Sequence, residues 1–242
     1  MIERAVVAGI ERILVPGYDL VSSRAAVALA RVHPGLIEAA VGIHPHFADQ
    51  PTDADWAELA VLAAAPEVVA VGEIGLDFFR MRSPRSAQEA ALARQLAIAA
   101  EVRKPVLVHD RDAHDAVRDA LLAWPGPAGR TFRGVLHCFS GDAELALALA
   151  AGGYLISFAM PVAFSSAKGP RAAAAALPDG SFLVETDSPW LAPGGGGQRN
   201  EPTSALRVAA ELARLRRTTP GAITVEVGRS YRALVGGPLP ME

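Results

Sequence analysis

The strongest constraint on the fold is the regular alternation of short apolar runs with longer stretches rich in alanine and leucine. Each apolar run leads into a polar loop and then a helical pattern, which is the order found in βαβ units with a parallel sheet. The runs show little apolar-polar alternation, as expected for strands buried on both faces. The predicted strands are Ile13–Val15, Leu36–Gly42, Val68–Gly72, Pro105–Val108, Gly134–Leu136, Tyr154–Phe158 and Phe182–Glu185.

Helical patterns lie between and after these strands. The clearest are Ala87–Val102, Asp112–Ala123, Ala143–Ala151 and a final one from Thr203 to Arg217. A length of 242 residues is normal for one α/β barrel, and no low-complexity linker divides the chain. We therefore predict a single TIM-like parallel β/α-barrel domain over residues 1–242.

The predicted strands number seven, whereas a closed barrel of this class has eight. The sequence opens within a helical pattern, Ile2–Ala8, so the strand that is not found would be the first. This predicts a barrel in which the first strand is missing from the given sequence.

Composition narrows the classes of function. The net charge is -3 and the pI is about 6.1, so the chain lacks the basic excess of proteins that coat duplex DNA. A nucleic-acid substrate would have to be bound locally, at the site. Cys138 is the only cysteine, which excludes an intramolecular disulfide and fits a reducing cytosol. With neither a signal pattern nor an apolar run of membrane-spanning length, we expect a cytoplasmic protein.

Ionisable residues follow four of the predicted strands. They are Glu73, His109, His137 and Asp187. The carboxyl ends of parallel barrel strands meet at one mouth, where enzymes of this class work. A single histidine at a strand end is more often a structural residue, but a dry core would have to desolvate all four groups without partners. We therefore predict that the set acts together.

This set comprises two imidazoles and two carboxylates, and its charge of about -2 balances one divalent cation. Mixed histidine and carboxylate ligation suits Zn, Mn or Fe, and suits Mg less well. A bound ion would polarise a scissile phosphoryl oxygen and lower the pKa of a bound water. Asp187 would then accept the water proton. The sequence thus predicts a metal-dependent hydrolase acting on phosphodiester bonds.

Other residues near the strand ends have two interpretations each. The His44-Pro45-His46 turn either belongs to the site or is an ordinary loop with no part in it. Arg111 either binds a phosphate bidentately or forms a salt bridge with Asp110 or Asp112.

Aromatic residues and glycines near the strand ends also have alternatives. The aromatic residues either stack on bases or pack their loops, and they are Phe78, Phe79, Phe164 and Trp190. Gly72 and Gly75 either allow a close backbone approach or are plain loop glycines.

Six motifs run in order along nearly the whole chain. They are Val41–His46, Val71–Asp77, Pro105–Asp112, Gly134–Gly141, Val184–Pro189 and Arg199–Pro202. Together they are highly specific, and through them the chain resembles the TatD-type metal-dependent deoxyribonucleases, which are amidohydrolase-like barrels.

The resemblance implies metal ligation by Glu73, His109, His137 and Asp187, with Asp187 and Glu73 as the catalytic residues. It implies substrate contacts from the His44/His46 loop, from Arg111, and from Arg199, Asn200 and Glu201 in the loop before Pro202. The implied partner is DNA, either single-stranded or at 3′ ends, and the implied reaction is 3′-to-5′ exonucleolytic hydrolysis with a divalent metal ion.

One feature departs from the family pattern. Family members begin with a strand that ends in a His-x-His pair, which helps to hold one metal of a two-metal site, and no such pair precedes Ile2. Either the given sequence starts at an internal methionine or the unit is truly lacking. We expect one divalent ion (Mg, Mn or Zn) in this chain, and two if a His-x-His strand is restored. The alternative functions are a degenerate barrel that serves as a binding module and a related amidohydrolase acting on small amides or esters.

Overall fold

A computed structural model describes residues 1–194 and 197–236. These residues form two compact units. The N-terminal unit comprises Arg12–Leu136 with Leu234–Gly236, and the C-terminal unit comprises Met1–Glu11 and His137–Ala233. The single barrel domain predicted over residues 1–242 stays a prediction.

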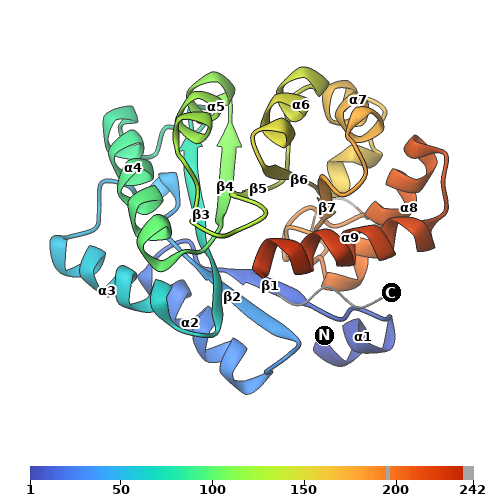
Figure 1. Ribbon diagram of the computed structural model, residues 1–242. Helices are drawn as coiled ribbons and strands as arrows, with labels where there is room; N and C mark the ends of the chain where they lie inside the picture. Colours follow the sequence, from blue (N-terminus) through green and yellow to red (C-terminus); the bar gives the residue numbers. More distant parts are fainter. Residues whose placement is uncertain (195–196, 237–242) are drawn as a thin grey trace. The chain divides into compact units, whose positions relative to one another are not determined.

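The N-terminal unit is a parallel sheet whose strands lie in sequence order, with helices between them. Helices α2, α3 and α4 follow one another along the same side of β2 and β3 (Figure 1). Its elements are β1 (Ile13–Pro16), α2 (Leu20–Val32), β2 (Ile37–Val41), the 3-10 turn η1 (Pro45–Phe47), α3 (Asp53–Ala64), β3 (Val68–Asp77), α4 (Arg85–Val102), β4 (Val106–Arg111), α5 (His114–Ala123) and β5 (Gly134–Leu136).

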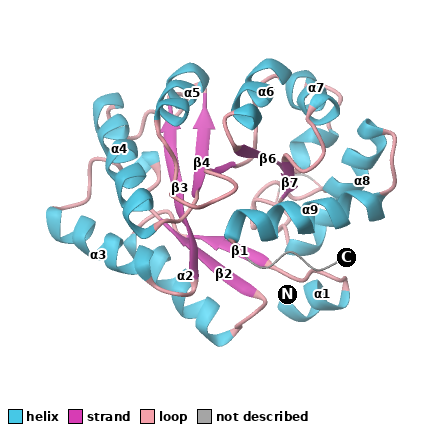
Figure 2. Cartoon of the chain, viewed as in Figure 1, coloured by secondary structure: helices cyan, strands magenta, loops and turns pink. Residues whose placement is uncertain are grey.

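The C-terminal unit continues the same pattern. Strands β6 and β7 pair in parallel, α6 packs on β6 and α7, and α8 packs on β7 (Figure 2). Its elements are α1 (Ile2–Val7), α6 (Ala143–Ala151), β6 (Tyr154–Phe158), η2 (Met160–Ala163), α7 (Lys168–Ala176), β7 (Phe182–Val184), η3 (Pro202–Ser204), α8 (Ala205–Arg216) and α9 (Pro220–Val235).

The seven predicted strands are confirmed within the described residues, and two of them, Gly134–Leu136 and Tyr154–Phe158, have the predicted bounds. The prediction that the last helix ends at Arg217 is wrong, because α9 follows it. Arg217 ends α8 in the left-handed conformation. The next helix then begins at Pro220, where the hydroxyl oxygen of Thr219 accepts a hydrogen bond from the Ala222 N–H at 3.2 Å. A capping threonine before a first-turn proline is a helix start signal, and Gly221 and Gly228 weaken the pattern that follows it.

The core of each unit is apolar. All five residues of β6 are buried, and the largest fully buried side chains include Tyr154, Phe158 and Leu59. No helix in the described ranges is long and apolar enough to cross a membrane.

Strand β3 extends five residues beyond its predicted end at Gly72, to Asp77. Its register against β4 shifts between Val71 and Ile74, and then resumes with Gly75 opposite His109 and Asp77 opposite Arg111. A Cβ on Gly75 would collide with the carbonyl oxygen of His109, and Gly75 has a φ of +135°. The predicted close backbone approach is therefore present at Gly75, and it brings the ends of β3 and β4 together.

Replacing Gly75 with alanine should destabilise the protein by about 2–5 kcal/mol, because the added Cβ forces the two strands apart and strains the backbone. The change can be measured as the free energy of unfolding in urea. Gly129→Ala is the matched control, since Gly129 also has a positive φ of +76° but has open space around a Cβ. It should cost only about 1–2 kcal/mol. Equal losses in the two variants would contradict the close approach.

Candidate metal centre

Three predicted site residues meet in the N-terminal unit. Glu73 lies on β3, His109 lies on β4 and His44 follows β2. One ligand atom from each lies within 4.8 Å of the other two. The Glu73 Oε1 atom is 3.0 Å from Nδ1 of His109 and 3.4 Å from Nε2 of His44. This group of a carboxylate and two imidazoles has the composition of a metal site.

The hydrogen bonds of His44 distinguish its role from that of His109. Nδ1 of His44 accepts a hydrogen bond from the His46 backbone N–H at 3.1 Å, which caps η1. In a neutral ring, Nε2 then carries the proton and points it at Glu73. Burial lowers the pKa of His44 and keeps the ring neutral, although Glu73 acts in the opposite direction. His44 is therefore arranged to donate to Glu73.

His109 lies between two carboxylates. Its Nδ1 faces Glu73, and its Nε2 lies 3.4 Å from Oδ2 of Asp77. Ligands at about 2.1 Å from a tetrahedral ion lie roughly 3.4 Å apart, so the 3.0 Å between Nδ1 and the Glu73 oxygen suits a shared ion. A carboxylate behind the second ring nitrogen is the usual support of a metal-bound histidine.

Asp77 is a site residue that sequence reasoning missed. Its side chain is 1% exposed, and its Oδ2 also lies 2.7 Å from Nε2 of His46. Burial acts to raise the pKa of Asp77, but hydrogen bonds from His109, the Arg80 N–H and His46 outweigh it, so the pKa is well below its ordinary value. Asp77 thus stays ionised and orients both histidines. It ends the same motif as Glu73, and that position was its only signal in the sequence.

Two buried glutamines of α4 hold the backbone beside these residues. Gln95 accepts a hydrogen bond from the Ile43 N–H at 2.7 Å and donates to the Ile43 carbonyl at 3.1 Å. Gln88 does the same for Asp77, at 2.8 and 3.1 Å. The two glutamines are seven residues apart, which places them on one face of the helix. They fix the positions of His44 and Asp77 through the backbone.

Gln95→Leu should destabilise the protein by about 2–4 kcal/mol, because it leaves the buried N–H and carbonyl groups of Ile43 without this partner. Urea unfolding measures the loss. Glu101→Leu introduces the same side chain at an exposed position of α4 and should change the free energy of unfolding by less than about 0.5 kcal/mol. If the two variants unfold alike, the amide clamp does not hold the loop.

The C-terminal unit repeats the arrangement around His137. Its Nδ1 lies 2.9 Å from Oε1 of Glu185, and its Nε2 lies 3.7 Å from Oδ1 of Asp187. Glu185 also accepts a hydrogen bond from the Cys138 N–H at 2.9 Å. His137 therefore has one carboxylate supporting it and a second, predicted ligand carboxylate at its other nitrogen. Sequence reasoning missed Glu185, although it stands at the end of the same predicted strand.

The residues before Pro202 differ in their surroundings. Asn200 is buried, and its amide donates to the carbonyls of Thr186 and Leu191 at 2.7 and 3.3 Å. It therefore braces the loop that carries Asp187. Glu201 is bound by the guanidinium of Arg4, and Arg199 is exposed. The substrate contacts expected from Arg199, Asn200 and Glu201 stay predictions.

Arg111 stacks on an aromatic ring. Its guanidinium carbon lies 4.2 Å from the ring centroid of Phe79. No ion pair with Asp110 or Asp112 is found among the described residues, and Asp110 is bonded to His114 at 2.7 Å. The side chains of Phe79, Phe164 and Trp190 are 57%, 55% and 71% exposed, so these rings do not pack into the core.

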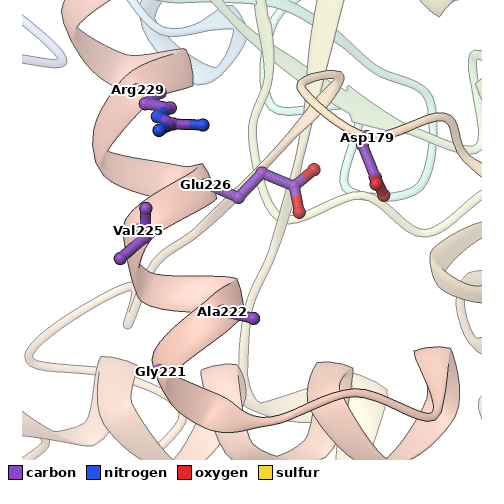
Figure 3. A pocket seen from close by; sticks show the side chains of 6 residues that line it. All are labelled: Asp179, Gly221, Ala222, Val225, Glu226 and Arg229. Carbon is purple, nitrogen blue, oxygen red and sulfur yellow. The ribbon is translucent and has the colours of Figure 1, made fainter. Parts of the chain in front are cut away.

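A surface hollow of about 410 Å³ in the C-terminal unit contains none of the predicted site residues. Figure 3 shows Glu226 reaching from α9 toward the loop that carries Asp179. Oε1 of Glu226 accepts a hydrogen bond from the Gly180 N–H at 2.5 Å. Burial nevertheless raises the pKa of Glu226 above its ordinary value. The six residues around the hollow are Asp179, Gly221, Ala222, Val225, Glu226 and Arg229.

Glu226→Gln should change stability in a pH-dependent way. A raised pKa means that the folded protein holds the Glu226 proton more tightly than the unfolded chain. The wild type should therefore gain stability relative to the variant as pH falls from 7 through the raised pKa toward 4.5, by less than about 1 kcal/mol. Urea unfolding at pH 7 and pH 4.5 measures the difference. A constant difference between the two proteins at both pH values would contradict the raised pKa.

The fold and these two histidine-carboxylate groups are those of a metal-dependent hydrolase of the β/α-barrel class. The profile of the family described as "TatD related DNase" matches residues 1–234, and the chain belongs to this family. The family prediction and its barrel fold class are thereby confirmed.

Individual relatives agree with the family match. The chain is 36% identical over 220 residues to the "Uncharacterized metal-dependent hydrolase YabD" of Bacillus subtilis, covering 90% of this chain and 85% of that protein. It is 36% identical over 232 residues to the "3'-5' ssDNA/RNA exonuclease TatD" of Yersinia pseudotuberculosis, covering 91% and 86%. The crystal structure of YJJV, a TatD homologue from Escherichia coli K12, matches with a TM-score of 0.88 and 33% identity, covering 98% and 91%.

Proposed function

We propose that this chain is a 3′-to-5′ exonuclease that hydrolyses phosphodiester bonds of single-stranded DNA. The observation that carries the proposal is the pair of matching groups, His109 with Glu73 and His137 with Asp187. Each histidine also has a supporting carboxylate at its other nitrogen, Asp77 or Glu185. The names of relatives that are 36% identical point to the same class of substrate.

The proposed metal ligands are Glu73, His109, His137 and Asp187, and we propose one divalent ion, Mg, Mn or Zn, per chain. Within each unit the histidine-carboxylate separation, 3.0 Å for His109 and Glu73 and 3.7 Å for His137 and Asp187, fits two neighbouring ligands of a metal ion. When bound, such an ion polarises the phosphoryl oxygen and acidifies a water molecule. Asp187, 30% exposed in its side chain, accepts the water proton as the general base.

The remaining residues position the site and the strand. His44 donates to Glu73 and holds its carboxylate in place. Asp77 and Glu185 fix the orientation of the two ligand histidines. His46, which is 19% exposed and bonded to Asp77, and Arg111 are the proposed contacts to substrate phosphate. Both lie near His109, and a guanidinium group can donate to a phosphate bidentately.

Glu73→Gln should abolish metal-dependent hydrolysis of single-stranded DNA, with a loss of at least about 100-fold, because the amide neutralises a ligand charge. His109→Ala should do the same. Elemental analysis of each dialysed protein should find about one ion in the wild type and less in both variants. Prior treatment with a chelator should stop wild-type hydrolysis, and added Mn should restore it.

His33→Ala is the matched control, since His33 lies at the C-terminal end of α2, before β2. It should keep both the metal and the activity. Undiminished hydrolysis in Glu73→Gln, or two tightly held ions in the wild type, would show that the proposed ligand set is wrong.

A further inference from the structure

Beyond the metal centre, the N-terminal unit carries an exposed surface built from Phe79, Arg80 and Arg111, which we name the Phe79 platform. The Phe79 side chain is 57% exposed. The guanidinium carbons of Arg111 and Arg80 lie 4.2 and 5.8 Å from its ring centroid. A large apolar ring and two guanidinium groups thus share one solvated surface.

The charges of this surface are available for a ligand. Neither Arg80 nor Arg111 has an ion pair in the part of the chain that the structure describes, although Asp110 and Asp112 flank Arg111. The neighbouring Arg85, by contrast, pairs with Glu89 at 2.8 Å and covers Phe78. An exposed cation–π contact holds a guanidinium only weakly, and the stacked guanidinium keeps its outer face and its N–H donors toward solvent. An aromatic ring and a guanidinium plane can each stack on an unpaired base, and the guanidinium N–H groups can donate to its phosphate.

The backbone places the platform next to the candidate metal centre. His109 and Arg111 are both on β4, two residues apart, so they project from the same face at a spacing of about 6.6 Å. On the neighbouring strand, Asp77 contacts His109 and lies two residues before Phe79. The Phe78 N–H donates to the Arg111 carbonyl at 2.9 Å and fixes this arrangement. The platform therefore lies beyond the His109 group, at the end of β4 and in the turn that follows β3.

We infer that the Phe79 platform binds the unpaired nucleobase adjacent to the phosphate at the His109 group. The base stacks on the exposed part of the Phe79 ring, beside the Arg111 guanidinium that already lies against this ring. The guanidinium N–H groups of Arg80 and Arg111 donate to the backbone phosphate of that nucleotide. A base in a duplex is already stacked and paired, so the platform selects single strands. This inference rests on the proposed function and names the part of the chain that recognises its substrate.

The test is binding of a fluorescent oligothymidylate to the full chain in the presence of a chelator, so that no hydrolysis occurs. Phe79→Ala should weaken binding by roughly 5- to 100-fold, as expected for the loss of one stacked base. Phe79→Trp should retain the affinity, since it keeps a ring. Arg111→Lys should lose part of the affinity, because lysine keeps the charge but not the stacking plane. Leu122→Ala removes an exposed apolar side chain from α5 and should bind like the wild type.

Oligonucleotides with a single abasic position test the stacking partner itself. At one position near the 3′ end, removal of the base should weaken wild-type binding about as much as Phe79→Ala does. The two changes together should cost no more than one, because they remove the same contact. Additive losses at every position, or wild-type affinity in Phe79→Ala, would overturn the platform.

The two proposals fail separately. A chain that binds single strands through Phe79 but does not cleave them with Mn would contradict the proposed nuclease and leave the platform standing. A chain that cleaves DNA and binds it equally well after Phe79→Ala would contradict only the platform. Urea unfolding of Phe79→Ala shows whether a loss of affinity reflects a loss of folded protein. If Phe79→Ala does not fold, the affinity of Phe79→Trp shows whether an aromatic ring at this position is enough for binding.

Discussion

The close approach of β3 and β4 at Gly75 and His109 is the constraint on which the N-terminal part of the site depends. The register shift between Val71 and Ile74 sets the two strands so that Gly75 faces His109 and Asp77 faces Arg111. A residue with a Cβ at Gly75 would meet the His109 carbonyl and separate the strands. Glu73 and Asp77 lie on β3, Phe79 lies in the turn after it, and His109 and Arg111 lie on β4. Both the proposed metal ligands of this unit and the proposed base-binding platform therefore depend on this contact.

Buried amide side chains also hold the backbone around the candidate site. Gln88, Gln95 and Asn200 each bond to backbone groups of residues at or beside the site, namely Asp77, Ile43 and Thr186. An amide carries a donor and an acceptor, so it can satisfy both polar groups of a peptide without introducing charge. Buried polar groups of this kind are costly unless they are fully bonded. These bonds fix the backbone on either side of the candidate ligands, and a metal centre depends on such support for the orientation of its ligands.

Both units place a histidine between two carboxylates, with different residues in each unit. In each, a histidine lies between a carboxylate that we propose as a metal ligand and a second carboxylate that we propose as its support. The members are His109 with Asp77 and Glu73, and His137 with Glu185 and Asp187. In both cases the sequence analysis named the histidine and the proposed ligand carboxylate, but not the second carboxylate. The second carboxylate faces Nε2 in His109 and Nδ1 in His137, and such a contact depends on the backbone conformation around both residues.

The sequence by itself determined the order of the strands, the strand ends that carry the candidate site residues, and the family, because hydrophobic periodicity and local motifs are properties of neighbouring residues. It did not reveal α9, whose glycines weaken the helical pattern. It also left open whether Arg111 binds a phosphate or pairs with Asp110 or Asp112, and whether the His44-Pro45-His46 turn belongs to the site. Only the tertiary structure showed where these side chains lie, since their contacts join different strands and helices. Phe79 reaches Arg111, Glu73 lies beside Nε2 of His44, and helix α4 supplies the glutamines, all through distances that chain order does not encode.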